Sequence, residues 1–291
     1  SVWVLAAPST AVTLATYAWR RFVRLFPIYW LYAGTFALLI YLGFGTQAKL
    51  PDSTAELLTS VTLVRFSSEV LPLPVAWSLI HELAFYTLFG LLILNLRAGL
   101  AAVALMAMTC IALFQYPSEG AELTAWQTYT AAYNLYFVFG MGAFLLYRRG
   151  GPGFVETAAG LCICVAAVVV MWQEVQYFQM LMAIGFALTL AGIAKLEQTG
   201  RLRAPRWLIY IGDASYSLYL MHLGLSSVLL RFAMKLQIYP MLGPELTYLL
   251  VLAVTVALAC IAYAVIERPL LGLLRHVRVP LAARKAGPRP T

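Results

Sequence analysis

The residues best suited to do chemistry in this chain are a few ionisable side chains inside long apolar runs. Glu82 lies nine residues into the run 73–96 and directly follows His81, and His222 lies near the middle of the run 207–230. An ionisable group inside a bilayer costs several kcal/mol unless it is paired or faces a cavity, so each one is a candidate for function. A carboxylate or an imidazole there could take a proton from a hydroxyl, as a general base does.

Each of these side chains also has a structural interpretation. Glu82 could be a protonated carboxyl that hydrogen-bonds a neighbouring helix. It projects about 100° away from His81 on a helix, so the two cannot form one face-to-face pair, and His81 fits a structural role. Asp213 lies where it could cap a helix, and Glu267 with Arg268 could form an interfacial pair or anchor. For His222 the functional and the structural interpretations both stay open.

Three arginines close together in the sequence indicate a function more strongly than these single ionisable residues do. Arg20, Arg21 and Arg24 lead directly into the segment 26–30, which holds a proline and three aromatic residues. Positions 21 and 24 share one helical face. Guanidinium groups held together at a membrane face can bind phosphates through paired hydrogen bonds, and an acyl-CoA offers several phosphates. The alternative is ordinary positive charge at the cytoplasmic end of a helix, but three arginines in five residues exceed what orientation requires.

The composition identifies the class of protein that must position these residues. Of the 291 residues, 62% are hydrophobic and 11% are charged, whereas a soluble domain carries about a quarter charged residues. The net charge of +8 comes from basic residues at the ends of apolar runs, which argues against nucleic-acid binding. The four cysteines lie inside apolar runs and suit small apolar fillers, so we expect neither a disulfide framework nor a metal site.

Eight continuous apolar runs predict the fold. Each is about long enough to cross a bilayer as a helix, and none alternates as a barrel strand would. The sequence therefore predicts an all-α, polytopic transmembrane helical bundle. Residues 1–18 resemble the end of a preceding helix and a short connection, so we expect the chain to be N-terminally incomplete. The runs are 22–44, 73–96, 98–116, 129–147, 153–172, 177–195, 207–230 and 246–266.

The lysines and arginines predict the orientation. With the end near Arg24 placed in the cytoplasm and the crossings alternated, 16 of the 20 fall on the cytoplasmic side. The other four are Lys49, Arg65, Arg231 and Lys235. The sequence thus predicts a multi-pass protein of a bacterial-type inner membrane with a cytoplasmic C-terminus. The basic tail at 275–291 should lie on the cytoplasmic leaflet.

The longest external loop, residues 45–72, is expected to contain a helix of its own. Ser53 and Glu56 have the spacing of a capping box, and apolar residues follow at 57, 58, 61, 63 and 64. We therefore predict a short interfacial helix on the outer surface.

Four segments resemble membrane-bound acyltransferase family 3, the O-antigen and exopolysaccharide O-acetylase type. They occur in the family's order across nearly the whole chain. They are Arg21-Phe-Val-Arg24-Leu-Phe-Pro27-Ile-Tyr29-Trp30, then Ala76-Trp77-Ser78-Leu79-Ile80-His81-Glu82-Leu83-Ala84-Phe85-Tyr86, then Ser215-Tyr216-Ser217-Leu218-Tyr219-Leu220-Met221-His222, and Ile266-Glu267-Arg268-Pro269.

The resemblance implies a site as well as a fold. It implies ten membrane helices, of which about eight are visible, and residues 1–274 as an acyltransferase domain that lacks its first one or two helices. The family's first helix carries an arginine followed by a histidine taken to be the essential base, and no such helix is present. It also implies donor binding at Arg21 and Arg24, a catalytic role for Glu82, with His222 and His81 as further candidates, and a path lined by Trp77, Tyr86, Tyr216 and Tyr219.

The implied function is transfer of an acyl group, acetyl being favoured, from a cytoplasmic acyl-CoA to a hydroxyl of a glycan, lipid-linked saccharide or other extracytoplasmic acceptor. Acetyl-CoA would be a co-substrate, with no bound cofactor. Two alternatives stay open. A transporter or flippase would show Gly- or Pro-broken helices in matched halves, which are not apparent here. A non-catalytic membrane subunit would tolerate Glu82→Gln.

Overall fold

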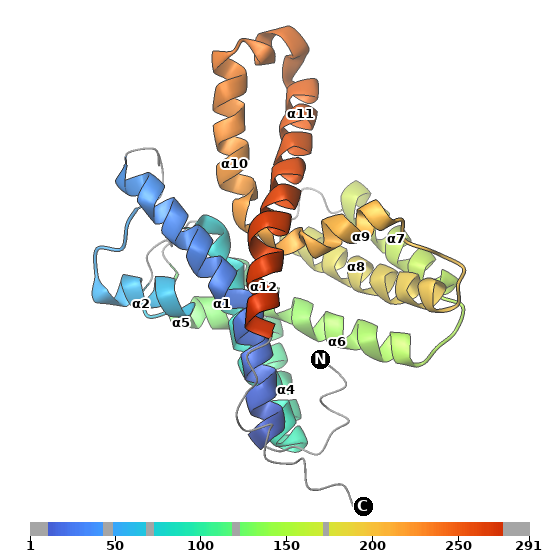
Figure 1. Ribbon diagram of the computed structural model, residues 1–291. Helices are drawn as coiled ribbons and strands as arrows, with labels where there is room; N and C mark the ends of the chain where they lie inside the picture. Colours follow the sequence, from blue (N-terminus) through green and yellow to red (C-terminus); the bar gives the residue numbers. More distant parts are fainter. Residues whose placement is uncertain (1–10, 43–48, 68–72, 118–122, 171–174, 276–291) are drawn as a thin grey trace, which may run out of the picture.

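The computed structural model describes residues 11–42, 49–67, 73–117, 123–170 and 175–275, and these segments are helical with no strand among them (Figure 1). This confirms the all-α prediction. The helices are α1 (Ala11–Tyr41), α2 (Thr54–Thr62), α3 (Trp77–Leu94), α4 (Leu96–Leu113), α5 (Ala125–Tyr129), α6 (Leu135–Arg148), α7 (Phe154–Val170), α8 (Val175–Gln198), α9 (Arg206–Asp213), α10 (Ser215–Lys235), α11 (Ile238–Ala262) and α12 (Arg268–Arg275). Short 3-10 turns, Pro74–Ala76 and Ala132–Asn134, precede α3 and α6, and a π-helix, Tyr263–Glu267, joins α11 to α12.

The predicted membrane crossings correspond to observed helices. Within the described segments, seven helical stretches are long and apolar enough to span a membrane, and α7 is apolar but shorter. The predicted run 153–172 matches α7, although its last two residues lie outside the described segments. Likewise, only Arg275 of the predicted basic tail lies inside them.

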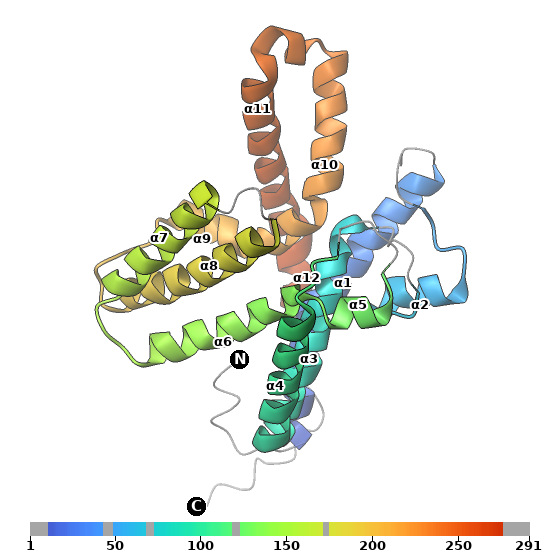
Figure 2. The same cartoon turned by 180° about the vertical axis from the view of Figure 1, so that it is seen from behind.

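The helices fan out in three groups that meet at one junction. Figures 1 and 2 show α10 and α11 as a hairpin at the top, α6, α7 and α8 on one side, and α3 and α4 at the bottom, with α12 near the centre. The closest packed pairs are α7 with α8, α10 with α11, α6 with α8 and α3 with α4. Helix α1 reaches across the junction and contacts α3, α10 and α12.

The first helix begins earlier than predicted. Residues 11–18 were expected to end a preceding helix, but they continue into the arginine cluster as part of α1. The reason is packing: the Tyr17 ring stacks on Phe89 of α3, with centroids 5.5 Å apart, and Leu14 packs beside Gly90. Both contacts bury an apolar face that extends the helix by about three turns.

The predicted helix over 207–230 is broken in two. Helix α9 ends at Asp213 and α10 starts at Ser215, so Asp213 is the last residue of a helix and not the cap of one. The start of α10 has no side-chain cap of its own. A carboxylate from another part of the chain, Glu267, meets it instead, because Ser217 donates its hydroxyl to Glu267 Oε2 at 2.6 Å. A negative charge at a helix N-terminus is favourable there.

The last predicted run, 246–266, begins directly after a bend in α11, and α11 itself starts one turn or two earlier, at Ile238. At Gly243 the backbone has φ 77°, and Pro244 follows it. A positive φ suits glycine, and the two residues together displace the first turn of α11 from the helix that follows. The apolar helix that crosses the junction therefore starts immediately after the bend.

The short helix in the loop 45–72 is confirmed. The Ser53 hydroxyl accepts from the Glu56 backbone N–H at 3.2 Å and donates to the Glu56 carboxylate at 2.8 Å. The Asp52 backbone N–H also donates to the Glu56 carboxylate at 2.9 Å, and this hydrogen bond, together with the one from the Ser53 hydroxyl, lowers the pKa of Glu56. Helix α2 ends at Leu63, whose backbone is left-handed. Its position on the outer surface stays a prediction.

Helices α7 and α8 approach each other closely through glycines. A Cβ at Gly160 of α7 would lie 2.6 Å from the Gly185 carbonyl oxygen of α8, and a Cβ at Gly185 would lie 2.9 Å from the Gly160 carbonyl oxygen. Small residues at such positions let two apolar helices gain packing contacts inside a membrane. A Cβ at Gly192 of α8 would lie 2.6 Å from the carbonyl oxygen of Gly153, just before α7, so the two helices run antiparallel.

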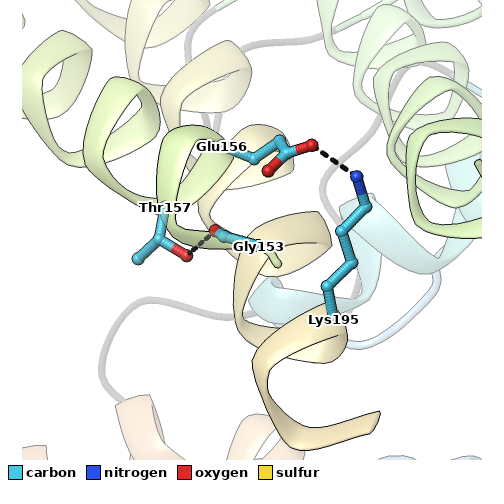
Figure 3. Close-up of polar contacts among 4 residues, drawn as sticks. All are labelled: Gly153, Glu156, Thr157 and Lys195. Carbon is cyan, nitrogen blue, oxygen red and sulfur yellow. Dashed lines mark hydrogen bonds and ion pairs between the residues drawn. The ribbon is translucent and has the colours of Figure 1, made fainter. Parts of the chain in front are cut away.

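An ion pair joins the ends of these two helices. Glu156 in the first turn of α7 binds Lys195 in the last turn of α8 (Figure 3). Each charge also lies at the helix end where the macrodipole favours it. The Lys195 side chain is only 3% exposed, whereas that of Glu156 is 22% exposed. The lysine therefore depends on its partner more than the glutamate does.

This asymmetry predicts unequal costs for the two halves of the pair. We expect Glu156→Gln to destabilise the protein by about 3 kcal/mol, because it leaves a buried ammonium uncompensated. Lys195→Met should cost about 1 kcal/mol, because Glu156 can turn to solvent. Thermal unfolding in detergent measures both, and the double variant should recover most of the loss. Equal losses for the two single variants would contradict the assigned asymmetry.

Candidate active site

The four segments singled out in the sequence meet at the junction of the helices. Buried residues of α1, the turn before α3, and α10 form one apolar cluster there, and Leu270 of α12 packs against it. The buried members are Leu25, Ile28, Tyr29, Tyr32, Leu63, Leu73, Val75, Ala76, Leu79, Ile80 and Leu220. The polar residues of the four segments lie around this cluster, so the fold brings together positions nearly 250 residues apart in the chain.

Arg21 lies over two aromatic rings where α1 crosses α3. Its guanidinium carbon is 5.3 Å from the centre of the Tyr17 ring and 4.8 Å from that of Tyr86. The two tyrosine rings meet edge to face at 6.4 Å. A guanidinium over aromatic faces is held in position electrostatically, and its hydrogen-bond donors still point outward along its plane.

Glu82 is tied to the same group. The Tyr86 hydroxyl donates to the Glu82 carboxylate, one helical turn earlier on α3. This contact lies within α3, so the link of Glu82 to a neighbouring helix stays a prediction. Glu82 is half-buried, and its charge acts on Tyr17 of α1 and Tyr216 of α10. Glu82, Tyr86 and Arg21 thus form one set at the junction.

Arg24 faces a second carboxylate. Its side chain is exposed, and its charge acts on the carboxylate of Glu267. Glu267 is 5% exposed and accepts from Ser217, which in turn accepts from the Tyr32 hydroxyl at 3.3 Å. Each of the two arginines of α1 thus lies near a carboxylate, Arg21 near Glu82 through Tyr86, and Arg24 near Glu267, the last residue of the π-helix.

The burial of Glu267 corrects the prediction of an interfacial pair with Arg268. Arg268 is exposed, whereas Glu267 points inward. The π-helix Tyr263–Glu267 causes this, because one extra residue in a helical turn shifts the faces of the residues that follow it. Sequence reasoning overlooked Ser217 and Tyr32 too, although both lie next to residues that were singled out.

Two tyrosines of α10 hold the junction together. The Tyr216 hydroxyl donates to the Leu25 carbonyl of α1 at 2.7 Å, and the Tyr219 hydroxyl donates to the Val75 carbonyl and pairs with the Ser78 hydroxyl. Both hydroxyls thus bind the backbone of neighbouring elements. The predicted role of these tyrosines in lining a substrate path stays a prediction.

His81 and Trp77 belong to a separate set of contacts. His81 is 4% exposed, and its Nδ1 lies 3.0 Å from Asn134 Oδ1. Its ring packs edge to face on Trp77 and on Tyr133. The Asn134 amide donates to three backbone carbonyls, so it fixes the turn before α6 and the histidine together. These contacts match the structural interpretation of His81.

His222 has one nitrogen engaged by the backbone. Its Nδ1 lies 2.7 Å from the Tyr219 carbonyl oxygen. A carbonyl only accepts, so Nδ1 carries the proton, and the neutral ring keeps its basic lone pair on Nε2. This tautomer is the one that a base acting through Nε2 would need. Its ring neighbour is Tyr219, one turn earlier on the same helix, at 5.8 Å.

No group of three or more His, Cys, Asp or Glu side chains suited to a metal ion gathers in the segments that the structure describes. The chemistry of the junction is that of guanidinium groups, carboxylates, tyrosine hydroxyls and one oriented imidazole.

Comparison with known proteins gives a family match and a relative. A family model described as an acyltransferase domain matches residues 3–264. The exopolysaccharide production protein ExoZ of Rhizobium meliloti (strain 1021) is 28% identical over 297 aligned residues, which cover 98% of this chain and 90% of that protein. No solved structure matches the chain.

Proposed function

The chain belongs to the membrane-bound acyltransferase family whose model it matches over residues 3–264, and from that premise we propose that it transfers an acetyl group from acetyl-CoA to a hydroxyl of a polysaccharide or of its lipid-linked precursor. Membership of this family makes the protein an acyltransferase, and its long apolar helices make it a multi-pass membrane protein. The donor, the acyl group and the acceptor belong to the proposal.

One observation carries the donor assignment: Arg21 and Arg24 of α1 both lie at the junction, Arg21 over the Tyr86 ring whose hydroxyl binds Glu82, and Arg24 exposed near Glu267. The carboxylates and tyrosines position the arginines, and the exposed Arg24 offers a charged fork for phosphate. The thioester end of the same donor would then reach Glu82. The junction thus combines recognition of an anionic donor with a proton acceptor.

In the proposed reaction the acceptor hydroxyl attacks the thioester of the donor. A base removes the proton from the acceptor hydroxyl as its oxygen attacks the thioester carbonyl carbon. The C–S bond then breaks, coenzyme A leaves as a thiol after taking up a proton, and an ester forms on the acceptor. Glu82 beside Arg21 is our first candidate for the base, and His222 with its basic Nε2 is the second.

Two observations support the proposed acceptor and the proposed orientation in the membrane. The relative ExoZ is named for exopolysaccharide production, which suggests a saccharide hydroxyl as acceptor here. The excess of lysine and arginine at the Arg24 ends of the helices suggests that the donor binds from the cytoplasm and that the C-terminus lies there, in the inner membrane.

A transfer assay tests the proposed function. The protein in proteoliposomes receives acetyl-CoA labelled in the acetyl group, together with membrane glycolipids and exopolysaccharide of the source organism. We expect label to enter the saccharide fraction as a hydroxylamine-sensitive ester. Labelled saccharide absent in the presence of bound acetyl-CoA would overturn the proposed acceptor. Saccharide flux across the vesicle without acylation would favour a transporter, and full activity of Glu82→Gln would favour a non-catalytic role for that residue.

A further inference from the structure

An apolar groove lies between α6 and α8, apart from the junction. It encloses about 830 Å³ and extends along both helices from Trp77 and Tyr133 at one end to Tyr147 and Ala194 at the other. Its lining residues on α8 extend from Phe178 to Ala194, which corresponds to about 24 Å of helix. The groove is therefore long and narrow, which is the shape of a hydrocarbon chain.

Small residues create this groove. Where two helices face each other with large side chains, those side chains fill the space between them. Here the facing positions include Gly140 and Ala143 of α6, and Ala183, Ala187 and Ala191 of α8. Aromatic residues such as Phe144 and Phe186 form the sides, and no charged residue lines the groove. Its interior favours an uncharged apolar occupant.

One end of the groove is basic. Arg148 and Arg149 directly follow Tyr147 at the end of α6, and both are exposed. The α7–α8 ion pair places the last turn of α8 at this same end, because only a short connection, residues 149–153, separates α6 from α7. The Arg201 guanidinium lies 5.2 Å from the Phe154 ring and so belongs to this end as well.

The carboxylates at this end do not cancel its charge. Glu156 is bound by Lys195, and Glu197 on the last turn of α8 is exposed. Against these two stand five cations: Arg148, Arg149, Lys195, Arg201 and Arg203. The end near Tyr147 thus carries an excess of three positive charges, while the end near Trp77 is lined by aromatic residues and Gln179.

We infer that this groove binds an anionic membrane phospholipid, with one acyl chain along α6 and α8 and the phosphate at Arg148 and Arg149. Charge complementarity selects this occupant. A soluble anion has no apolar chain to fill the groove. A zwitterionic lipid has no net negative charge, so its electrostatic attraction to the basic end is weaker. Basic pockets between membrane helices bind anionic head groups in this way. The inference is independent of the proposed acyl transfer.

Two glycines on α6 provide a matched pair of variants. A Cβ at Gly140 or at Gly142 would meet no other atom within 4 Å, so both positions have space for a side chain. Gly140 lines the groove and Gly142 does not. Leucine at 140 should therefore fill the groove, whereas leucine at 142 adds the same volume to the same helix outside it.

The experiment measures the lipid that stays bound. The protein is purified from membranes containing phosphatidylglycerol and phosphatidylethanolamine, and native mass spectrometry identifies the retained species. We expect wild type and Gly142→Leu to retain phosphatidylglycerol, and Gly140→Leu to retain about tenfold less. Arg148→Gln with Arg149→Gln should lose the preference for phosphatidylglycerol while a lipid chain stays bound, and Arg97→Gln should keep that preference.

Three outcomes would overturn the inference. Equal retention by wild type and Gly140→Leu would show that the lipid binds elsewhere. Unchanged preference in the double arginine variant would remove the assigned phosphate contact. Retention of a polyprenyl-linked saccharide, or of no lipid at all, would exclude a phospholipid as the occupant. None of these outcomes depends on whether the protein transfers an acyl group.

Discussion

Replacing Arg21 and Arg24 together with alanine is expected to abolish binding of acetyl-CoA while the protein remains folded and inserted. A hydrogen bond to a charged group contributes about 1.5–3 kcal/mol, so the loss of both guanidinium groups should weaken donor binding more than about a hundredfold. Arg21→Ala alone also removes the cation that lies over Tyr17 and Tyr86. Arg24→Ala removes the exposed cation and leaves those rings in place.

Titration of acetyl-CoA into the purified variants measures this effect directly. Arg97→Ala is the matched control, because Arg97 is exposed at the start of α4 and contributes nothing to the junction. Its affinity should equal that of wild type. Donor binding that survives in the double variant would refute the assignment of α1 as the donor site, and it would direct attention to the other arginines of the predicted cytoplasmic side.

The overall class of the fold could be predicted from hydropathy, because a run of about 20 apolar residues has few alternatives to a membrane helix. The capping hydrogen bonds of α2 could be predicted as well, because Ser53 and Glu56 lie within one helical turn of each other. Both features depend on residues that are close in the chain. Sequence patterns report such local relations well.

The errors concern relations between distant residues or changes of helical phase. Hydropathy cannot distinguish one long run from two helices, so the break at Ala214 between α9 and α10 was not predicted. The inward turn of Glu267 depends on one extra residue in a π-helical turn, and no residue type marks that insertion. The pair Glu156–Lys195 joins residues 39 positions apart, which only the packing of α7 on α8 brings together.

For the candidate site, the sequence indicated which segments come together more reliably than which contacts each residue makes. Arg21, Glu82 and Tyr86 do form one set of contacts. His81 and Trp77, from the same segment as Glu82, face Asn134 and Tyr133 instead. Adjacent residues on a helix project in directions about 100° apart, so one segment serves two environments. Only the neighbouring helices determine which residue faces which.

Tyr86 contacts both Arg21 and Glu82. The Tyr86 hydroxyl binds the carboxylate, and its ring lies beneath the guanidinium. Tyr86 therefore links the positions of the two groups. In the proposed reaction a donor phosphate would approach Arg21 beside the carboxylate that would take the proton from the acceptor.

Glu82→Gln is expected to lower kcat about 10²- to 10⁴-fold while the affinity for acetyl-CoA stays close to that of wild type. Glutamine keeps the size and can still accept from Tyr86, but it cannot take a proton. Initial rates of acetyl transfer, with donor affinity measured separately, distinguish these quantities. Thr87→Val, an exposed change on the next turn of α3, should leave both unchanged.

Tyr86→Phe separates a catalytic Glu82 from one that only positions its neighbours. If Glu82 served only to hold Tyr86 beneath Arg21, Glu82→Gln would keep most of kcat, because glutamine still accepts from Tyr86, and Tyr86→Phe would lower it. We expect instead that Tyr86→Phe weakens donor affinity severalfold and retains most of kcat, because the carboxylate survives. Normal kcat in Glu82→Gln together with a lost kcat in His222→Asn would transfer the role of base to His222, whose Nδ1 is already fixed by the Tyr219 carbonyl. The two results together therefore identify whether Glu82 or His222 takes the proton from the acceptor hydroxyl.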